Sequence, residues 1–516
     1  MTLAATEITT ADATAAGIAT TDYRLADFKL LIPLGPAVTV MSEYATCWWF
    51  ANHLALDVGK VVVICNTTEQ ITAVEAMGEN AEGHLQVPDN LTVDVLITMS
   101  DQYYDHVREG GAVLRVSSGE AVNAPPSYKF EHLGSWSAAP SWPEFRYLVP
   151  VSATGGRQAR NEFRLPYDAQ ATLLRVYRRK GLAPAVTLQE QIRSTLRQSV
   201  DPDIGMETHW TIFSGQQGEG NPIVCFATDQ SGDCRYVVKT SRYAGQTHLI
   251  DEQRQIETVQ AMLGSTLSER IIAPVTSLGL GERTMLAYRF VHTHPFYGLR
   301  WRLANRTCYL ATLSTWLSEV AVQTAHTLPA ADFARQHLAP LQRLTDSKRL
   351  PDWLHDSARR AIDELSELSD TPLSILEHGD LGCYNTRMTA SDGSDFKVLD
   401  WGSATTDGAP LGDLCYALAV SNAPKRTARR LIEHYLDTVG YPREFALTLW
   451  LAYMGRRWEE LDKIRGIRAT DAFSGGGVLL HTTSRICQFL GIETDRNPPS
   501  RLKRLLGSAK HRPSLA

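Results

Sequence analysis

The sequence predicts an α/β domain followed by a two-lobed α+β domain. In the first third of the chain, short β-branched runs alternate with helix-compatible segments, which is typical of a parallel sheet covered by helices. From residue 209, strand patterns come first, and helical patterns dominate from about residue 297 to about residue 490. This order indicates a small sheet-rich lobe followed by a large helical lobe. A chain of 516 residues is long enough for two or more such domains.

Composition shifts along the chain set the expected boundaries. We expect a disordered Thr- and Ala-rich lead-in at residues 1–22 and a first domain at residues 23–199. A short linker at 200–208 should lead to a second domain at 209–495 and a basic tail at 496–516. The basic tail also allows a weaker hypothesis, which is contact with an anionic membrane surface.

Bulk composition narrows the class of protein. The chain is 43% hydrophobic and 21% charged, with a formal net charge of −6, which is typical of a soluble globular protein and gives no signature of nucleic-acid binding. It has no basic and apolar leader, and no apolar run long enough to cross a membrane. None of its eight cysteines forms a Cys-x-x-Cys pair, so we expect free thiols and a cytoplasmic location.

The first domain contains runs suited to buried strands. Four such runs are AVTVM (37–41), VVVIC (61–65), VDVLITM (93–99) and AVLRV (112–116). A helix is expected around residues 67–77. Residues 169–199 are also expected to be helical, with a break near Gly181.

The second domain begins with three expected strands, at residues 209–213, 222–227 and 235–240. The loop between the first two contains Gly215 and Gly218, whose lack of a side chain would let backbone N–H groups approach a phosphate. A simple flexible hairpin explains this loop equally well. A helix is expected over residues 248–263, and another strand over residues 284–290.

Two motifs carry the chemistry, HGDLGCYN and KVLDWGSA. They contain Asp380, Asn385 and Asp400, and a hairpin would bring Asp400 back beside the other two. A carboxylate would then face a substrate hydroxyl, while an amide and a second carboxylate would face a hard cation. Mg²⁺ uses one or two carboxylates together with phosphate oxygens and water. Phosphoryl transfer needs this arrangement, because its catalysis is mostly positioning and charge neutralisation.

These motifs resemble those of the aminoglycoside phosphotransferase family, which is related to choline kinase and other small-molecule kinases with a protein-kinase-like fold. The resemblance covers residues from about 209 to about 490. It implies that Asp380 is the catalytic aspartate, that Asn385 and Asp400 hold Mg²⁺, and that His378 and Asp413 brace the loop. It further implies that ATP is the phosphate donor.

The same resemblance places an ATP-binding lysine on the third strand of the small lobe, which is Lys239. Its partner would be a glutamate of the next helix. Glu252 lies on the apolar stripe of that helix and is preferred, whereas Glu257 fits some family spacings better. The adenine would meet a hinge at Phe290 and Val291.

The later part of the first domain is similar to a class I S-adenosylmethionine methyltransferase, a Rossmann-like fold. A strand with an aspartate, a helix and a Gly-Gly turn follow one another there, but the glycine-rich cofactor loop is missing. We therefore expect a degenerate methyltransferase-like domain.

The sequence thus predicts a small-molecule kinase that phosphorylates a hydroxyl of an aminoglycoside, an amino alcohol or a sugar-like compound. Two alternatives stay open. One is a bifunctional methyltransferase–kinase that modifies a glycan or antibiotic scaffold, and the other is a catalytically inactive binding protein with a kinase fold.

Overall fold

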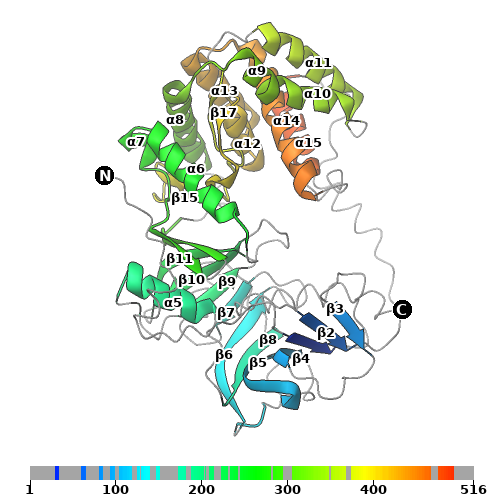
Figure 1. The fold of residues 1–516 in the computed structure, drawn as a ribbon. Helices are drawn as coiled ribbons and strands as arrows, with labels where there is room; N and C mark the ends of the chain where they lie inside the picture. Colours follow the sequence, from blue (N-terminus) through cyan, green and yellow to red (C-terminus); the bar gives the residue numbers. More distant parts are fainter. Residues whose placement is uncertain are drawn as a thin grey trace, which may run out of the picture. The chain divides into compact units, whose positions relative to one another are not determined.

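The fold is described from a computed structural model. The structure describes residues 29–33, 60–64, 81–84, 93–98, 104–118, 125–127, 129–139, 147–150, 172–181, 188–202, 204, 209–213, 222–229, 233–241, 245–280, 283–294, 305–347, 350–367, 373–465 and 475–492. The chain divides into two compact units. The first contains Met1–Leu249 and Pro274–Phe290, and the second contains Ile250–Ala273 and Val291–Ala516. Figure 1 shows strands concentrated in the first unit and helices in the second.

A thirteen-stranded sheet joins the described strands of the first unit. Its strand order is β12-β13-β11-β10-β9-β7-β6-β8-β5-β4-β1-β2-β3. The strands are β1 (Lys29–Pro33), β2 (Lys60–Ile64), β3 (Ala81–His84), β4 (Val93–Thr98), β5 (Val107–Ser118), β6 (Phe130–Ala139), β7 (Tyr147–Pro150), β8 (Thr172–Arg179), β9 (His209–Phe213), β10 (Ile223–Thr228), β11 (Cys234–Thr240), β12 (Thr276–Leu280) and β13 (Arg283–Arg289).

Five strands at one end of this sheet are parallel. Their order is β3-β2-β1-β4-β5, and each neighbouring pair runs in the same direction. Strands β2, β4 and β5 coincide with three of the predicted runs, and the predicted parallel pairing is present in them. The run at 37–41 and the helix at 67–77 lie outside the described residues.

The prediction of a helix over residues 169–199 is wrong for its first half. Residues Thr172–Arg179 form β8, which pairs antiparallel with β5 on one side and with β6 on the other. Seven residue pairs join β8 to β5, so both edges of the segment have backbone partners. Strand pairing of this extent overrides a local helical preference. The second half does form a helix, α5 (Leu188–Ser199).

Strands β9, β10, β11 and β13 confirm the strands predicted for the small lobe, and adjacent members pair antiparallel. Strand β9 also pairs with β7, so the sheet continues across the predicted linker at 200–208. These strands therefore belong to the first of the two compact units, and most of the helices that follow belong to the second. The predicted lead-in at 1–22 and the tail at 496–516 lie outside the described residues.

The second unit is mainly helical and contains two short antiparallel strand pairs, β14 with β17 and β15 with β16. Its elements after α6 (His248–Met262) are α7 (Ser265–Ser268), α8 (Arg306–Thr324), α9 (Ala330–Phe333), a π-helix at Ala334–Leu338, α10 (Ala339–Asp346), α11 (Asp352–Glu367), β14 (Ile375–Glu377), β15 (Thr386–Met388), β16 (Phe396–Val398), the 3₁₀ turn η5 (Trp401–Ser403), β17 (Thr405–Gly408), α12 (Gly412–Val420), α13 (Lys425–Val439), η6 (Arg443–Phe445), α14 (Ala446–Arg465) and α15 (Gly475–Leu490).

Aromatic packing fixes α8 against the segment that carries the second motif. The Trp316 ring lies edge-on to Phe396 at 5.8 Å and to Trp401 at 6.5 Å, and all three side chains are buried. Aromatic pairs of this kind add about 0.5–1.5 kcal/mol beyond their burial. The residues on either side of Asp400 are therefore held by the core of the unit.

Two further features bear on the expectations from composition. Within the described part of the chain, no helix is both long and apolar enough to cross a membrane. The six cysteines in that part are free thiols, namely Cys225, Cys234, Cys308, Cys383, Cys415 and Cys487.

Candidate active site

A hairpin brings the two motifs together. Strands β15 and β16 pair antiparallel, with Thr386 opposite Val398. The backbone N–H of Leu399 donates to the carbonyl oxygen of Asn385 at 3.0 Å, which continues the ladder by one residue. Asp400 therefore follows directly from the end of the hairpin at which Asn385 lies. The hairpin predicted from the spacing of the motifs is confirmed.

The loop before β15 turns sharply at Gly379. This residue has φ of +81°, a conformation that favours glycine, and an added Cβ would collide with the carbonyl oxygen of Ser403. The hydroxyl of Tyr453 donates to the Gly379 carbonyl at 2.7 Å. The middle residue of the HGD motif is therefore required by the close approach of the η5 backbone.

His378 is a buried, neutral brace. Its Nδ1 accepts the backbone N–H of Asp380 at 3.2 Å, so its proton lies on Nε2, which donates to the Leu399 carbonyl at 3.0 Å. Burial lowers the pKa of His378, which keeps the ring uncharged. The imidazole thus connects the loop of the first motif to the strand end of the second. This is the bracing role that the family resemblance implies.

Asp413 braces the same loop from α12. Its two carboxylate oxygens accept the backbone N–H groups of His378 at 2.6 Å and Gly379 at 3.0 Å. Burial and the neighbouring Glu377 carboxylate raise the pKa of Asp413 to about 8, against the opposing effect of those two N–H groups.

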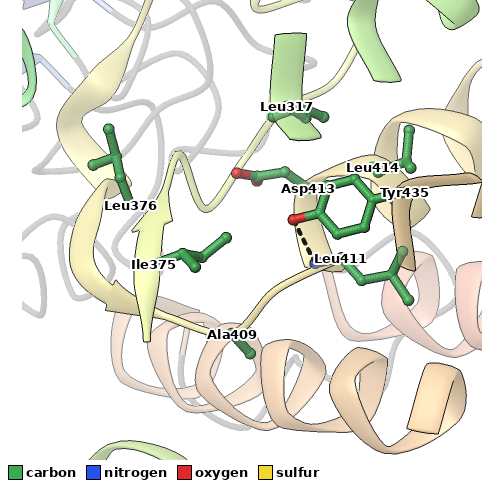
Figure 2. Close-up of a pocket in the computed structure, with 8 residues that line it drawn as sticks. All are labelled: Leu317, Ile375, Leu376, Ala409, Leu411, Asp413, Leu414 and Tyr435. Atoms are coloured by element: carbon green, nitrogen blue, oxygen red, sulfur yellow. Dashed lines mark hydrogen bonds between the residues drawn. The ribbon is translucent and has the colours of Figure 1, made fainter. Parts of the chain in front are cut away.

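Asp413 also lines a small pocket behind the loop. Figure 2 shows the lining residues, which are Leu317, Ile375, Leu376, Ala409, Leu411, Asp413, Leu414 and Tyr435. Leu411 has φ of +74°, which is strained for a leucine, and its N–H donates to the Tyr435 hydroxyl at 3.2 Å. This bond holds the turn that starts α12 and so aims Asp413 at the loop.

The raised pKa of Asp413 predicts a pH-dependent stability. The folded state holds a proton that the unfolded chain releases near pH 4, so this group's contribution falls as pH rises from about 4 to about 8. We expect the free energy of unfolding to decrease between pH 6 and pH 8, measured by chemical denaturation. Asp413→Asn should lose about 1–3 kcal/mol at pH 6, because one buried N–H loses its acceptor.

The decrease between pH 6 and pH 8 should be smaller in Asp413→Asn than in wild type. Asp437→Asn is the matched control, since Asp437 is an exposed carboxylate whose pKa is lowered by Arg443. It should keep the wild-type slope. An unchanged slope in Asp413→Asn would show that another group is responsible.

A buried ion pair supports the strand before the loop. Glu377 pairs with Arg456 of α14 and also accepts the backbone N–H of Ala409 at 3.1 Å. Arg456 lies 3.4 Å from Nδ1 of His337, a residue of the π-helix whose Nε2 lies 2.9 Å from the Ser374 hydroxyl. Burial, together with Arg456, lowers the pKa of His337 to about 3, so this imidazole is neutral. Such a fully bonded network rigidifies the base of the site.

Asp380 faces outward from this frame and has three side-chain partners. The Tyr384 hydroxyl donates to Oδ1 at 2.9 Å, and Nη2 of Arg457 lies 3.4 Å from the same oxygen. The Asn385 amide nitrogen lies 3.3 Å from Oδ2 and donates to the Asp380 carbonyl at 2.9 Å. With its nitrogen engaged in this way, Asn385 would act as a metal ligand through its amide oxygen.

Asp400 has an unusual backbone for a residue other than glycine. Its φ of +67° and ψ of +60° lie in the left-handed region, where aspartate and asparagine are enriched and where strain often marks functional sites. The residue is exposed, directly before the buried Trp401.

The donor set formed by Asn385 and Asp400 fits Mg²⁺. It offers one amide oxygen and one carboxylate, and phosphate oxygens and water would complete an octahedral shell. No cluster of three or more His, Cys, Asp or Glu side chains suited to a metal is found in the described parts of the chain.

The remaining predicted residues lie partly in the first unit. Lys239 is half-buried on β11, opposite Val224 of β10 and Leu286 of β13, and its ammonium lies 5.7 Å from the centre of the Tyr288 ring. It is thus on the predicted strand. Gly215 and Gly218 lie outside the described residues.

The two candidate glutamates on α6 differ in burial. Glu252 is 5% exposed and lies on the same side as the buried Ile256 and Val259. Glu257 is exposed and accepts a hydrogen bond from Gln253 at 2.9 Å. A carboxylate as buried as Glu252 requires a partner, so burial favours it over Glu257. Its pairing with Lys239 stays a prediction.

The predicted hinge coincides with a division of the chain. The first unit ends at Phe290 and the second resumes at Val291. The N–H of Phe290 still bonds to the Arg235 carbonyl at 2.9 Å, so the strand ladder ends at this residue. Adenine binding there stays a prediction.

Sequence reasoning missed three residues around Asp380. Tyr384 lies inside the motif and is visible as a large side chain between Cys383 and Asn385, but nothing in the sequence shows that its hydroxyl reaches Asp380. Arg457 and Tyr416 come from distant helices and give no sequence signal at all.

Comparisons with known proteins give only distant likenesses. No protein-family model and no curated protein matches the chain. Among solved structures, aminoglycoside 2'-phosphotransferase-IIIa with GDP matches 57% of this chain and 97% of its own, at 14% identity and a TM-score of 0.40.

Two further solved structures are similar at the same level. The aminoglycoside phosphotransferase APH(3'')-Id from Streptomyces rimosus, with ADP and streptomycin, matches 51% of this chain and 98% of its own, at 14% identity and a TM-score of 0.33. A choline/ethanolamine kinase family protein from Mesorhizobium loti matches 59% and 98%, at 13% identity and a TM-score of 0.36. These neighbours are phosphotransferases and kinases of small molecules. At TM-scores below 0.5, the assignment of function rests on the geometry of the site itself.

Proposed function

We propose that this chain is an ATP- and Mg²⁺-dependent phosphotransferase that moves the γ-phosphate of ATP to a hydroxyl of a small molecule. The observation that carries the proposal is the hairpin that joins Asn385 and Asp400, with the Asp380 carboxylate beside them and bonded to a hydroxyl group. Asp380 already makes the hydrogen bond that an acceptor hydroxyl would make.

Each residue then has one task. Asp380 orients the acceptor hydroxyl and takes its proton as the oxygen–phosphorus bond forms. Asn385 and Asp400 would hold Mg²⁺, which supplies neutralisation of the phosphate charge when bound. Lys239 would bind the α- and β-phosphates through its ammonium group, with Glu252 as its preferred partner.

The acceptor class is also part of the proposal. We retain aminoglycosides, amino alcohols and sugar-like compounds as candidates, because the motifs around Asp380 and Asp400 resemble those of small-molecule kinases. A cytoplasmic location is retained as an expectation from the free cysteines.

Measurement of ADP release tests this proposal. Purified full-length protein, ATP and Mg²⁺ would be assayed with a panel of aminoglycosides, amino alcohols and sugars. We expect at least one class of acceptor to stimulate release and chelation of Mg²⁺ to abolish it. If the protein does not bind ATP at all, the kinase assignment is wrong. If ATP binds but neither transfer nor hydrolysis occurs, the alternative of an inactive binding protein is favoured.

The two glutamates of α6 give a matched pair of variants. We expect Glu252→Gln to lower kcat/KM for ATP at least about tenfold, which corresponds to about 1.4 kcal/mol, because the buried carboxylate loses its charge. Glu257→Gln should have little effect, since Glu257 is exposed. Initial rates at varied ATP distinguish them, and the reverse pattern would assign the role to Glu257.

A second function is favoured by one observation in the first unit. In the strand order β3-β2-β1-β4-β5, the chain adds β2 and β3 on one side of β1 and then β4 and β5 on the other side. Open parallel sheets bind ligands at such a switch point. With this order in view, we keep the bifunctional methyltransferase–kinase with a Rossmann-like first domain as the alternative proposal. Calorimetric titration of the full chain with S-adenosylmethionine tests it, and absence of heat would leave the domain as a scaffold.

A further inference from the structure

Tyr384 occupies the place that an acceptor hydroxyl needs. Its hydroxyl donates to Oδ1 of Asp380 at 2.9 Å, which is the contact required of a hydroxyl about to lose its proton. Tyr384 has 42% of its surface exposed. It is one of four large hydrophobic residues that are exposed among the described residues. A half-exposed tyrosine is therefore bonded to the proposed catalytic aspartate.

A second tyrosine fixes the direction of these hydrogen bonds. The hydroxyls of Tyr384 and Tyr416 lie 2.6 Å apart. Since the single proton of Tyr384 goes to Asp380, Tyr416 must donate to Tyr384.

The base of this chain of hydrogen bonds is rigid. Tyr416 is 8% exposed on α12, and its ring lies 6.2 Å from that of Tyr453. Tyr453 is fully buried and bonds to the Gly379 carbonyl. The donor behind Tyr384 is therefore fixed to the same frame as the loop, and Tyr384 is its only half-exposed member.

The ring of Tyr384 lies against Gly382, two residues earlier. A Cβ added to Gly382 would collide with the edge of this ring. The backbone of Gly382 is not in the left-handed region, so alanine fits the backbone there but not the present position of the tyrosine. Gly382 thus leaves the space that the ring needs to reach Asp380.

We propose that Tyr384 guards Asp380, by holding the place of the acceptor hydroxyl until an acceptor displaces it and thereby keeping water from attacking ATP. This inference rests on the proposed function. The reaction it suppresses is hydrolysis, in which a water oxygen bonds to the γ-phosphorus and the bond from that phosphorus to the bridging oxygen of ADP breaks. Asp380 takes the proton of the water, and phosphate and ADP leave.

Arg457 keeps the negative charge of the Asp380 carboxylate paired when the Tyr384 hydroxyl moves away. Its guanidinium lies 3.4 Å from the same carboxylate oxygen, donates to the Ser403 hydroxyl at 3.3 Å and is 14% exposed. Asp380 thus keeps a cationic partner when the Tyr384 hydroxyl is replaced by the acceptor hydroxyl.

The test measures phosphate release from Mg-ATP without any acceptor, beside ADP release with a saturating acceptor. We expect Tyr384→Phe to raise acceptor-independent hydrolysis about tenfold, the size of effect given by a hydrogen bond to a charged group. Its acceptor-stimulated rate should stay within about threefold of wild type, and its KM for the acceptor should fall. A merely structural role would lower both rates together.

Gly382→Ala is an independent variant that keeps the tyrosine hydroxyl. Because the added methyl group pushes the ring away, this variant should also raise acceptor-independent hydrolysis. In the Tyr384→Phe background, Gly382→Ala should add much less than it does alone, since both changes open the same guard. Full additivity would show that the two residues act separately and would overturn the proposal.

Tyr309→Phe is the matched control. It also removes a tyrosine hydroxyl, bonded to Thr386 at 2.8 Å, but it leaves the partners of Asp380 unchanged. It should not raise hydrolysis. If wild type transfers phosphate and Tyr384→Phe hydrolyses ATP no faster, only the guard is refuted. If wild type binds ATP but neither transfers nor hydrolyses, the proposed function fails first. Phosphate found on Tyr384 by mass spectrometry would make it an acceptor and overturn the guard.

Discussion

Asp380→Asn should abolish most acceptor-stimulated ADP release while the protein still folds and binds ATP. The substitution keeps the shape of the side chain and an oxygen that the Tyr384 hydroxyl can reach, but it removes the group that takes the acceptor proton. Loss of a general base costs about 10²–10⁴-fold in rate. The decrease should appear in kcat, with KM for ATP nearly unchanged.

The control for this variant is Asp407→Asn. Asp407 is a partly exposed carboxylate in the same unit and pairs with His326, away from the loop. We expect wild-type rates from it. Calorimetric titration with Mg-ATP and thermal unfolding of both variants would separate loss of chemistry from loss of folding. Near wild-type turnover by Asp380→Asn would show that another group receives the proton.

Much of the fold of the second half could be predicted from the sequence because its signals are local. The strands β9, β10 and β11 are short runs bounded by turn residues, and α6 has an apolar stripe at helical spacing. The hairpin between the motifs was predictable for the same reason, since only short strands and a turn separate Asn385 from Asp400.

Failures of prediction arise where distant partners decide the structure. The segment that forms β8 has helical patterning, and only its pairing with β5 and β6 makes it a strand. The pairing of β7 with β9 was equally unforeseen, because it joins strands from both sides of the predicted linker. Neither pairing can be predicted from the residues of a short local segment.

The site follows the same rule. The motif residues were predictable because their types and spacing suit Mg²⁺ and a hydroxyl acceptor. The groups that hold them were not, since Arg457 comes from α14 and Tyr416 from α12. The guanidinium reaches Asp380, and the Tyr416 hydroxyl reaches Tyr384, only after the helices pack. A glutamate–arginine pair such as Glu377 with Arg456 is likewise invisible until both helix and strand are placed.

Asp400→Asn should be the second most damaging change and should shift the dependence on Mg²⁺. Asparagine tolerates the left-handed backbone of this position, so the variant tests the charge of Asp400 rather than its conformation. Replacing a group in the second coordination shell of a metal costs about 10–100-fold in affinity or activity, and a direct ligand should cost at least about 100-fold. The measurement is the rate of ADP release at increasing Mg²⁺.

The Mg²⁺ concentration that gives half-maximal activity should rise in Asp400→Asn, and part of the rate should return at high Mg²⁺. Asp395→Asn is a suitable comparison, because Asp395 comes from the same hairpin segment and pairs with Arg270 rather than facing the loop. It should keep the wild-type dependence. An unchanged Mg²⁺ dependence in Asp400→Asn, with turnover lost, would mean that Asp400 positions the hairpin and that the ion is held elsewhere. Rescue by Mg²⁺ would instead assign the carboxylate to the ion, because only a lost ligand can be offset by more of the metal.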